Sequence, residues 1–340
     1  MAQENMNNDN LALDIQNLTI HYEVDGDVVE AVNDVTLQLE HGKTLGLVGE
    51  TGAGKTSTAL AILKMIPDPP GIIKSGSIKV CGHDIMSASK KELHDIRGND
   101  VSMIFQDPMT SLNPVFTVGE QIAESILLHE PGISKKDAFE RAMQMLETVG
   151  IPRERAFEYP HQFSGGMKQR VVIAIALACN PQLLLADEPT TALDVTIQAQ
   201  VLDLMRKLRE EYQMSMVMIT HDLGIVAEVC DEVAVMYAGR IVERGTLREV
   251  FKNTKHPYTE GLFNSLPNPR DRKAALIPIP GLMPDPANLP EGCAFAERCS
   301  YATDACRCGQ PSMHQFSETH SVLCTAYDNE GFHIRRNHNG

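Results

Sequence analysis

Long apolar runs and basic residues are both scarce in this chain of 340 residues. The longest unbroken apolar run, residues 171–179, has nine residues, whereas an α-helix needs about 20 to cross a bilayer. We therefore expect that the chain does not cross a membrane by itself. Lys and Arg number 30 against 45 Asp and Glu, a net charge of −15. This balance disfavours a nucleic-acid partner, because phosphate backbones need a basic face.

The first residues of the given sequence do not resemble an export signal. Its first ten residues, MAQENMNNDN, contain four Asn and no apolar core, so they match neither a signal peptide nor a membrane anchor. We expect residues 1–10 to form a disordered tail. Eight Cys without an export signal indicate a reducing compartment, in which clustered thiols favour metal binding or catalysis over disulfides.

The remaining composition is that of a globular protein. Apolar residues make up 43% of the chain, enough to bury a full core and to build more than one domain. Alternating apolar residues in 11–21 and 31–39 predict antiparallel strands. Short β-rich runs alternate with helical stretches further on, which is typical of a parallel sheet with crossover helices. These runs are residues 101–105, 183–186, 216–219 and 233–237.

A phosphate-binding pattern, G-x-x-x-x-G-K-[ST], lies between the apolar run 44–48 and a helical stretch that includes Ser57. Its residues are Gly49, Glu50, Thr51, Gly52, Ala53, Gly54, Lys55 and Thr56. Such glycines let backbone N–H groups turn around phosphate oxygens, and the helix N-terminus adds its positive end. Lys55 can reach the terminal phosphates and Thr56 can offer a hydroxyl to Mg²⁺. The pattern therefore predicts a nucleoside triphosphate site.

Two carboxylates follow the apolar run 183–186. Side chains alternate along a strand, so Asp187 and Glu188 face different directions and can take separate tasks. We expect Asp187 to hold Mg²⁺ and Glu188 to polarise the attacking water. An acidic loop after a core strand is the simpler alternative, and the phosphate-binding loop in the same chain makes it less attractive.

A third segment, Phe163-Ser164-Gly165-Gly166-Met167, precedes an apolar-periodic helix. Ser164 is placed to cap this helix, and helix N-termini with glycine backbones bind anions. Taken alone, the segment predicts only a capped helix start.

Together these motifs resemble an ATP-binding-cassette (ABC) ATPase over residues 11–250. The resemblance is carried, in order, by Tyr22, GETGAGKT at 49–56, Gln106 in FQDP, FSGGMKQR at 163–170, LLLADEP at 183–189, TALD at 191–194 and His221 in ITHD. It implies an α/β phosphate-loop NTPase core with a mixed sheet and an antiparallel β subdomain. It also implies a helical subdomain inserted at about 107–178, where 117–149 shows two successive helical periods.

The resemblance assigns further roles. Tyr22 would stack on adenine, Gln106 would touch Mg²⁺ or the lytic water and couple to the membrane partner, and His221 would contact the γ-phosphate. The Ser164, Gly165 and Gly166 segment would bind the γ-phosphate held by an opposing subunit, with Asp194 at the dimer seam. Each also has a simpler alternative: an edge-strand aromatic for Tyr22, ordinary polar loop residues for Gln106 and Asp194, and a helix cap for His221. Because there is one copy of each motif, a second ATPase subunit is required.

The composition changes after residue 250. Seven Pro within 267–290 exclude a continuous helix there, and we name this segment the connector. Beyond it Cys293, Cys299, Cys306 and Cys324 follow a C-x₅-C-x₆-C-x₁₇-C spacing. Four thiolates can bind Zn²⁺ or hold an iron–sulfur cluster. The open spacing favours the cluster, because structural zinc sites usually have tighter pairs.

Alternatives remain for this cysteine group. Cys308 competes with Cys306 as third ligand, His314 or His320 could replace a thiol in a zinc site, and the thiols could all be free. Cys81, Cys179 and Cys230 lie in apolar stretches and are expected in the core.

Residues 251–340 form a C-terminal extension, of which about 251–325 resembles the corresponding part of oligopeptide and dipeptide importer ATPases. The similarity is carried by His256-Pro257-Tyr258-Thr259, the connector and GCAFAERC at 292–299, and it implies a [4Fe-4S] cluster. It also implies ATP and Mg²⁺ as cofactors and a peripheral location on the cytoplasmic face of the inner membrane. The implied partners are a paralogous ATPase, two membrane permeases and an external solute-binding protein. An importer of nickel chelates or another small solute, and a soluble ATPase acting on nucleic acid or the ribosome, are the alternatives.

Overall fold

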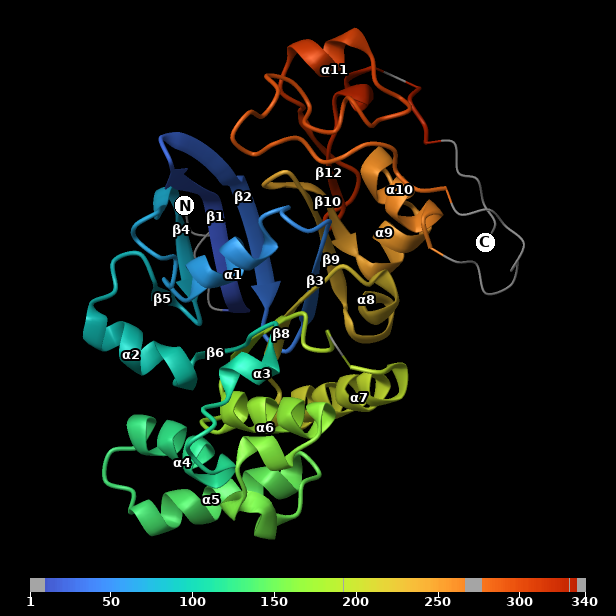
Figure 1. The fold of residues 1–340 in the computed structure, drawn as a ribbon. Coiled ribbons are helices and arrows are strands. Elements are labelled where there is room, and N and C mark those ends of the chain that lie inside the picture. The colour runs from blue at the N-terminus through green and yellow to red at the C-terminus, as the bar shows by residue number, and fades with distance from the viewer. Residues whose placement is uncertain (1–9, 192, 267–276, 330, 335–340) are drawn as a thin grey trace.

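The computed structural model describes residues 10–191, 193–266, 277–329 and 331–334. Most of the predicted N-terminal tail, Ala192 of the TALD motif and residues 267–276 of the connector lie outside these described residues. Figure 1 shows two sheets in the upper part of the molecule, a group of helices below them, and the red segment that includes Asp304–Cys308 (α11) on top.

The main sheet has eight strands in the order β11-β12-β10-β9-β3-β8-β7-β6. Its central strands β9, β3, β8, β7 and β6 are parallel, whereas β10, β11 and β12 pair antiparallel at one edge. The mixed sheet expected from the sequence is therefore confirmed. The strands are β3 (Thr44–Val48), β6 (Val101–Ile104), β7 (Leu183–Asp187), β8 (Ser215–Thr220), β9 (Glu232–Tyr237), β10 (Arg240–Thr246), β11 (Met313–Gln315) and β12 (Ser321–Leu323).

A second sheet of four antiparallel strands has the order β2-β1-β4-β5. Its two long strands are joined at Asp25 and Gly26, both of which have positive φ angles, as a tight hairpin turn requires. The antiparallel pair predicted from alternating apolar residues is thus confirmed. The strands are β1 (Leu11–Val24), β2 (Asp27–Glu40), β4 (Gly71–Val80) and β5 (His83–Asp84).

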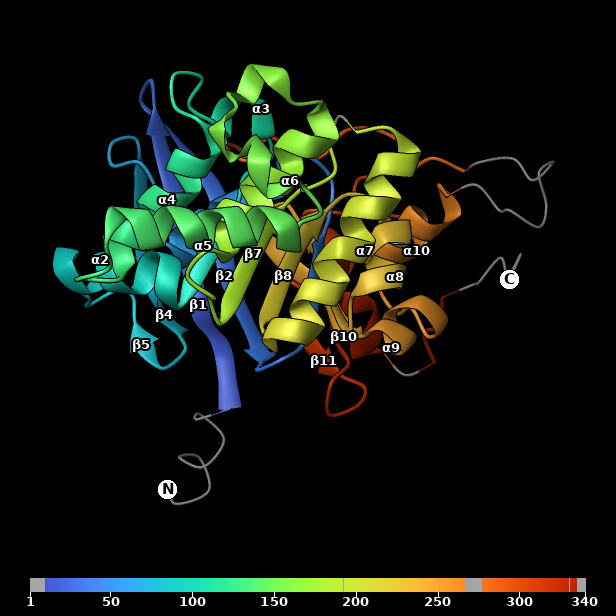
Figure 2. The ribbon, with the colours of Figure 1, turned by 90° about the horizontal axis from the view of Figure 1, so that it is seen from below.

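Between β6 and β7 the chain forms only helices. Thr117 begins the helix Val118–His129 with a capping box, in which it exchanges hydrogen bonds with Glu120. Seen from below, α4 and α5 lie on the outside of this group, with α6 between them and the sheet (Figure 2). The elements are α3 (Pro108–Ser111), α4 (Val118–His129), α5 (Lys135–Thr148), the 3₁₀ turns Arg153–Phe157 and Pro160–Gln162, and α6 (Gly165–Leu177).

The remaining helices surround the two sheets. Asp194 begins the longest of them, because its carboxylate accepts a hydrogen bond from the Ile197 N–H at 3.0 Å. They are α1 (Lys55–Ile62), α2 (Lys90–Asn99), α7 (Val195–Tyr212), α8 (Leu223–Val229), α9 (Leu247–Lys252), α10 (Pro257–Asn264), α11 (Asp304–Cys308) and the 3₁₀ turn Thr325–Asp328.

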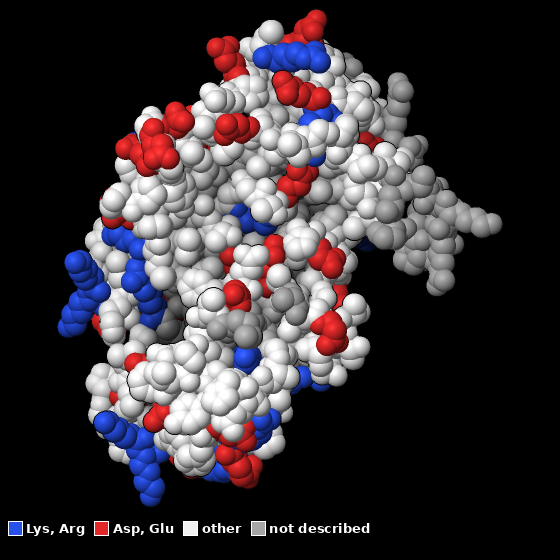
Figure 3. All heavy atoms as spheres, viewed as in Figure 1, with Lys and Arg blue, Asp and Glu red and all other residues white. Residues whose placement is uncertain are grey.

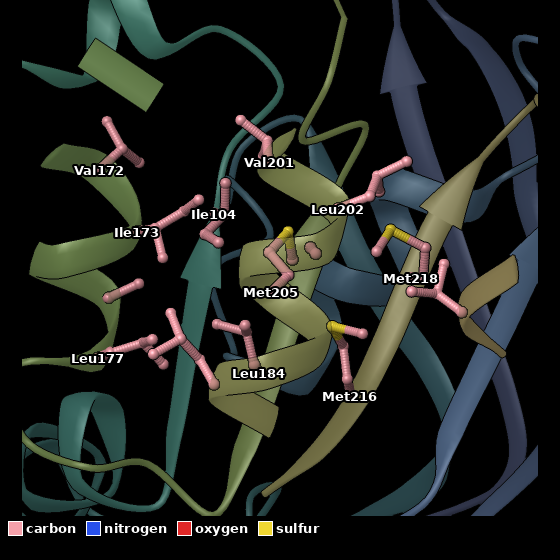
Figure 4. Close-up of a cluster of buried hydrophobic side chains, with 14 of the residues drawn as sticks. Ile104, Val172, Ile173, Leu177, Leu184, Val201, Leu202, Met205, Met216 and Met218 are labelled. Atoms are coloured by element: carbon pink, nitrogen blue, oxygen red, sulfur yellow. The ribbon is translucent and has the colours of Figure 1, made fainter. Parts of the chain in front are cut away.

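One core lies between the main sheet and helices α6 and α7 (Figure 4). Ile173 on α6 and Met205 on α7 are buried against Leu184 on β7 and Met216 on β8. Each such side chain contributes about 1.5–3 kcal/mol when fully buried. Because the core fills one face of the strands, it holds their carboxyl ends at a common edge.

The C-terminal extension joins the main sheet, which its short and apolar-poor segments did not predict. Strand β12 pairs with β10 through Val322 and Ser321. Beneath this pairing the fully buried carboxylate of Glu243 accepts hydrogen bonds from the backbone N–H groups of Lys255 and His256 and lies 2.9 Å from His320 Nε2. A buried carboxylate is stable only when hydrogen bonds satisfy its oxygens. Glu243 therefore stabilises the attachment of the extension to the sheet.

Acidic side chains are spread over the face seen in Figure 3, consistent with the net charge of −15. Lys and Arg gather at its left edge, over α2, which begins with Lys90 and Lys91, and at its lower left, over the helices between β6 and β7.

None of the helices in the described ranges combines the length and the apolar character needed to span a bilayer.

Replacing Glu243 by Ala tests how the extension is attached. We expect Glu243→Ala to lower the free energy of unfolding by about 3 kcal/mol, because the backbone N–H groups of Lys255 and His256 and the ring of His320 lose their buried partner. Urea denaturation measures this change. The control Glu228→Ala removes an exposed carboxylate and is expected to leave the midpoint unchanged. Equal midpoints for both variants would contradict the role assigned to Glu243.

Candidate nucleotide-binding site

The phosphate-binding loop (residues 49–56) connects β3 to α1. Gly54 has φ +103°, and a Cβ atom there would lie 2.3 Å from the carbonyl oxygen of Ala31. Gly52 also has a positive φ of +84°. These glycines therefore allow a backbone path that other residues would strain or block.

Lys55 folds back over this loop. Its Nζ donates hydrogen bonds to the carbonyl oxygens of Gly49 at 2.7 Å and Glu50 at 2.9 Å. Burial lowers the pKa of Lys55, and the nearby carboxylates of Glu188, Asp187 and Glu50 oppose this effect. The ammonium group is thus held at the loop with few competing water contacts, where it can meet a phosphate.

Asp187 comes from the end of β7, two strands away from β3 in the sheet. The hydroxyl of Thr56 donates a hydrogen bond of 2.9 Å to Asp187 Oδ2. Burial raises the pKa of Asp187, while the Thr56 hydrogen bond acts in the opposite direction. A hydroxyl and a carboxylate in contact are oxygen ligands of the kind that Mg²⁺ prefers.

Glu188, the next residue, turns away from the strand with φ 46°. Its carboxylate lies 2.9 Å from His221 Nδ1 and accepts hydrogen bonds from Gln106 Nε2 at 3.0 Å and Thr191 Oγ1 at 2.9 Å. Burial acts to raise the pKa of Glu188, but the hydrogen bonds from His221 and Thr191 outweigh it and the pKa is lowered. Glu188 is therefore held as a carboxylate by three polar partners from separate loops.

Lys55, Asp187 and Glu188 line one cavity of about 400 Å³, together with Thr56, Gln106 and His221. The structure thus brings Lys55 and Asp187 into the shared site that the motif order predicted. Tyr22 also lines this cavity, and its hydroxyl donates a hydrogen bond to Ser57 Oγ at 3.2 Å. The lining residues are Tyr22, Val29, Ala31, Thr51, Gly52, Gly54, Lys55, Thr56, Ser57, Gln106, Asp187, Glu188, His221 and Pro286.

Three lining residues were not predicted from the sequence. Val29 and Ala31 are on β2, and Pro286 belongs to the connector, almost 100 positions after Glu188. Nothing in their residue types points to a nucleotide. They could be found only from the three-dimensional contact of β2 with the connector, in which the Glu30 N–H donates to the Pro286 carbonyl oxygen at 2.8 Å.

The segment with Ser164, Gly165 and Gly166 does not reach this cavity. Ser164 caps α6 as predicted, accepting a hydrogen bond from the Met167 N–H at 3.4 Å. Ser164 and Gly165 are exposed. A helix cap was the simpler alternative for His221, but in the structure Asp222 caps α8.

A second, smaller cavity is lined by four cysteines of the C-terminal extension. They are Cys293, Cys299, Cys306 and Cys324. Burial raises the pKa of Cys299 to about 11 and that of Cys324 to about 12, and the neighbouring thiols add to this effect. In the described parts of the chain, no three His, Cys, Asp or Glu side chains form a group able to hold a metal ion.

The other candidate ligands lie elsewhere. Cys308 is exposed and does not line the cysteine cavity. His314 is 2.9 Å from Asp328, and His320 is engaged with Glu243. Neither histidine lines the cavity, so the alternative in which one of them replaces a thiol does not fit this geometry. Cys230 is buried, whereas Cys81 and Cys179 are partly buried against the cores.

Sequence profiles match both parts of the chain. Residues 32–191 match a profile described as "ABC transporter", and residues 242–306 match one described as "Oligopeptide/dipeptide transporter, C-terminal region". The first match includes the phosphate-binding loop, Gln106, Asp187 and Glu188, and the second includes Cys293, Cys299 and Cys306.

Curated relatives span almost the whole chain. An oligopeptide transport ATP-binding protein of Bacillus subtilis (strain 168) is 52% identical over 91% of this chain and 87% of its own length. A dipeptide transport ATP-binding protein of Haemophilus influenzae is 45% identical over 94% of this chain and 96% of its own. Among solved structures, a dimeric ATP-binding cassette bound to ADP and phosphate superposes with a TM-score of 0.63 at 27% identity, covering 69% of this chain and 99% of that one.

Substituting Gly54 tests whether the cavity depends on the loop path. A Cβ at Gly54 would collide with the carbonyl oxygen of Ala31, and strain of about 1–3 kcal/mol corresponds to a loss of affinity of about five- to 150-fold. We expect Gly54→Ala to weaken ATP binding by a factor in that range in a calorimetric titration. Gly132→Ala is the matched control, because Gly132 has a similar φ of +98° with no heavy atom within 4 Å of the added Cβ. Unchanged ATP binding in Gly54→Ala would exclude this loop as the phosphate site.

Proposed function

The chain belongs to the ABC transporter family, in the group of oligopeptide and dipeptide transport ATP-binding proteins, and on that premise we propose that it hydrolyses ATP to energise peptide uptake. The observation that carries the proposal is the convergence of Lys55, Asp187 and Glu188 on one cavity, in a chain that also has the transporter-type C-terminal region. The profile matched by that region and the names of the relatives favour peptides over nickel chelates or another small solute, and over nucleic acid or the ribosome as the object of the ATPase.

We assign the phosphate-binding loop and Lys55 to the β- and γ-phosphates of ATP. Thr56, Asp187 and Gln106 would hold Mg²⁺, which neutralises charge on the phosphates when bound. The 2.9 Å contact between Thr56 and Asp187 supports this assignment. Tyr22, fixed by its hydrogen bond to Ser57, would stack on adenine at the open side of the cavity.

Glu188 is proposed to polarise the attacking water. Its lowered pKa keeps it ionised near neutral pH, so it can accept the developing proton. His221 would contact the γ-phosphate while its ring orients Glu188. Positioning and charge stabilisation by these groups would supply most of the catalysis, as in other phosphoryl transfers.

The site is proposed to be completed by a second ATPase subunit. Ser164, Gly165 and Gly166 lie outside the cavity of their own chain, and the exposed Ser164 and Gly165 are available to the γ-phosphate of a partner. The solved cassette that superposes on this chain is described as a dimer. We propose a paralogous partner, with Asp194 at the seam between the two cassettes.

The other proposed partners follow from transport itself. A peptide importer needs two membrane permeases and an external solute-binding protein, and the ATPase would dock on the permeases at the cytoplasmic face of the membrane. Residues 11–250 would form the nucleotide-binding domain, with a helical subdomain at about 107–178, and residues 251–340 the extension. ATP would close the paired cassettes, and hydrolysis would reset them.

We further propose that the cysteine cavity holds a [4Fe-4S] cluster. Four thiols line one buried space, and four thiolates are the usual ligand set of such a cluster. The hydroxyl of Thr325, which also lines this cavity, is buried without a hydrogen-bond partner. Such a donor suits a cluster sulfur. The cluster would stabilise the fold of the extension, whose own apolar content is small.

Replacing the carboxylate of Glu188 separates binding from hydrolysis. Glu188→Gln is expected to keep ATP affinity within about twofold and to lower turnover by at least about 100-fold, since general-base catalysis contributes that much. Calorimetry and a phosphate-release assay on the assembled transporter measure the two quantities. The control Glu211→Gln changes an exposed carboxylate on α7. Unchanged turnover in Glu188→Gln would remove this residue from the mechanism.

Metal analysis tests the cluster. After anaerobic purification we expect about four iron and four sulfide per chain, lost in Cys299→Ser and retained in Cys308→Ser, whose thiol lies outside the cavity. Cys81→Ser serves as a further control. A colourless, metal-free chain with a protease-resistant extension would contradict the proposal, and stoichiometric zinc would replace it with the zinc alternative.

A further inference from the structure

Arg298, in the cysteine-containing part of the extension, reaches the phosphate-binding loop. Its guanidinium donates a hydrogen bond of 2.9 Å to Glu50 Oε2 and another of 3.2 Å to the hydroxyl of Tyr237. The Arg298 side chain is only 8% exposed and that of Glu50 30% exposed. This ion pair joins positions 248 residues apart and is shielded from water, so it is stronger than an ordinary surface pair.

The backbone of Glu50 is held from the same side. Its N–H donates to the hydroxyl of Tyr258 at 3.0 Å, and Tyr258 is fully buried. The rings of Tyr237, Tyr258 and Phe295 pack against one another with centroids 4.6–5.4 Å apart. Because Phe295 precedes Arg298 in the same turn, this aromatic cluster fixes the guanidinium where it meets Glu50.

Arg298 also holds the connector. Its Nε donates to the carbonyl oxygen of Pro280 at 2.9 Å. From there the connector passes the loop, where Met283 Cε would lie 3.2 Å from a Cβ at Gly52. It then places Pro286 on the wall of the nucleotide cavity. One side chain thus links the extension, the connector and the phosphate-binding loop.

The charge of Glu50 would be unfavourable without this partner. A carboxylate in the loop that receives a triphosphate repels it, and the repulsion is strong where water is scarce. Glu50 is close enough to Lys55 to interact electrostatically with its ammonium group. Arg298 cancels the negative charge and keeps the Glu50 side chain turned toward the extension.

We propose that Arg298 is a positioning residue of the nucleotide site, which neutralises and orients Glu50 so that the loop accepts the phosphates of ATP. This inference rests on the proposed ATPase function. The C-terminal extension is thereby part of the nucleotide site of its own chain, rather than a separate module attached to it.

Nucleotide titrations of the full-length chain test this role. We expect Arg298→Met to weaken ATP binding about tenfold and ADP binding less, because repulsion by an unpaired Glu50 grows with phosphate charge. A general folding defect would weaken both nucleotides equally. Arg298→Lys, which keeps the positive charge but loses the Nε contact with Pro280, is expected to weaken ATP binding less than Arg298→Met does. Arg307→Met, which alters an exposed arginine of the same module, is the matched control.

The double variant Glu50→Gln/Arg298→Met tests most specifically whether the charge of Glu50 causes the loss of ATP affinity. Removing the carboxylate removes the repulsion, so ATP affinity is expected to recover to within about threefold of wild type. ATP affinity unchanged in Arg298→Met, or equal losses for ATP and ADP with no recovery in the double variant, would overturn the inference while leaving the ATPase function intact. Failure of the wild-type chain to bind ATP would overturn the proposed function itself.

Discussion

The structure depends on one constraint: strands β3 and β7 run parallel on either side of β8, so both end at the same edge of the sheet. The phosphate-binding loop leaves β3 at this edge and Asp187 ends β7 there, and Thr56 joins the two by a hydrogen bond of 2.9 Å. In open α/β sheets, ligands bind beyond the carboxyl ends of the strands. The core packed under α6 and α7 keeps this geometry fixed, so the catalytic arrangement is a consequence of the fold.

The C-terminal extension contacts the main sheet and, at this edge, also the phosphate-binding loop. Strand β12 extends the main sheet, Glu243 fastens the extension beneath it, and Arg298 reaches back to Glu50. An extension that served only to recognise another protein would not need contacts with the phosphate-binding loop. These contacts explain physically why a transport ATPase would keep a module with so little core of its own next to its nucleotide site.

Much of this arrangement could be predicted from the sequence, because it depends on local signals. The glycines of the loop, the carboxylates at the end of β7 and the Ser164 cap are each determined by a few neighbouring residues, and the order of the motifs indicated one shared site. The contribution of the extension could not be predicted in this way. Strands β11 and β12 have three residues each, too few for a periodic pattern, and the pairing of Arg298 with Glu50 joins positions that only the complete fold brings together.

The central claim is that a single cavity between Lys55 and Asp187 binds ATP together with Mg²⁺. A calorimetric titration of the purified full-length chain with ATP, in the presence and absence of Mg²⁺, tests it most directly. The account predicts one binding site per chain with an affinity that increases when Mg²⁺ is present. Negligible heat of binding under both conditions, for a chain shown to be folded, would contradict the account.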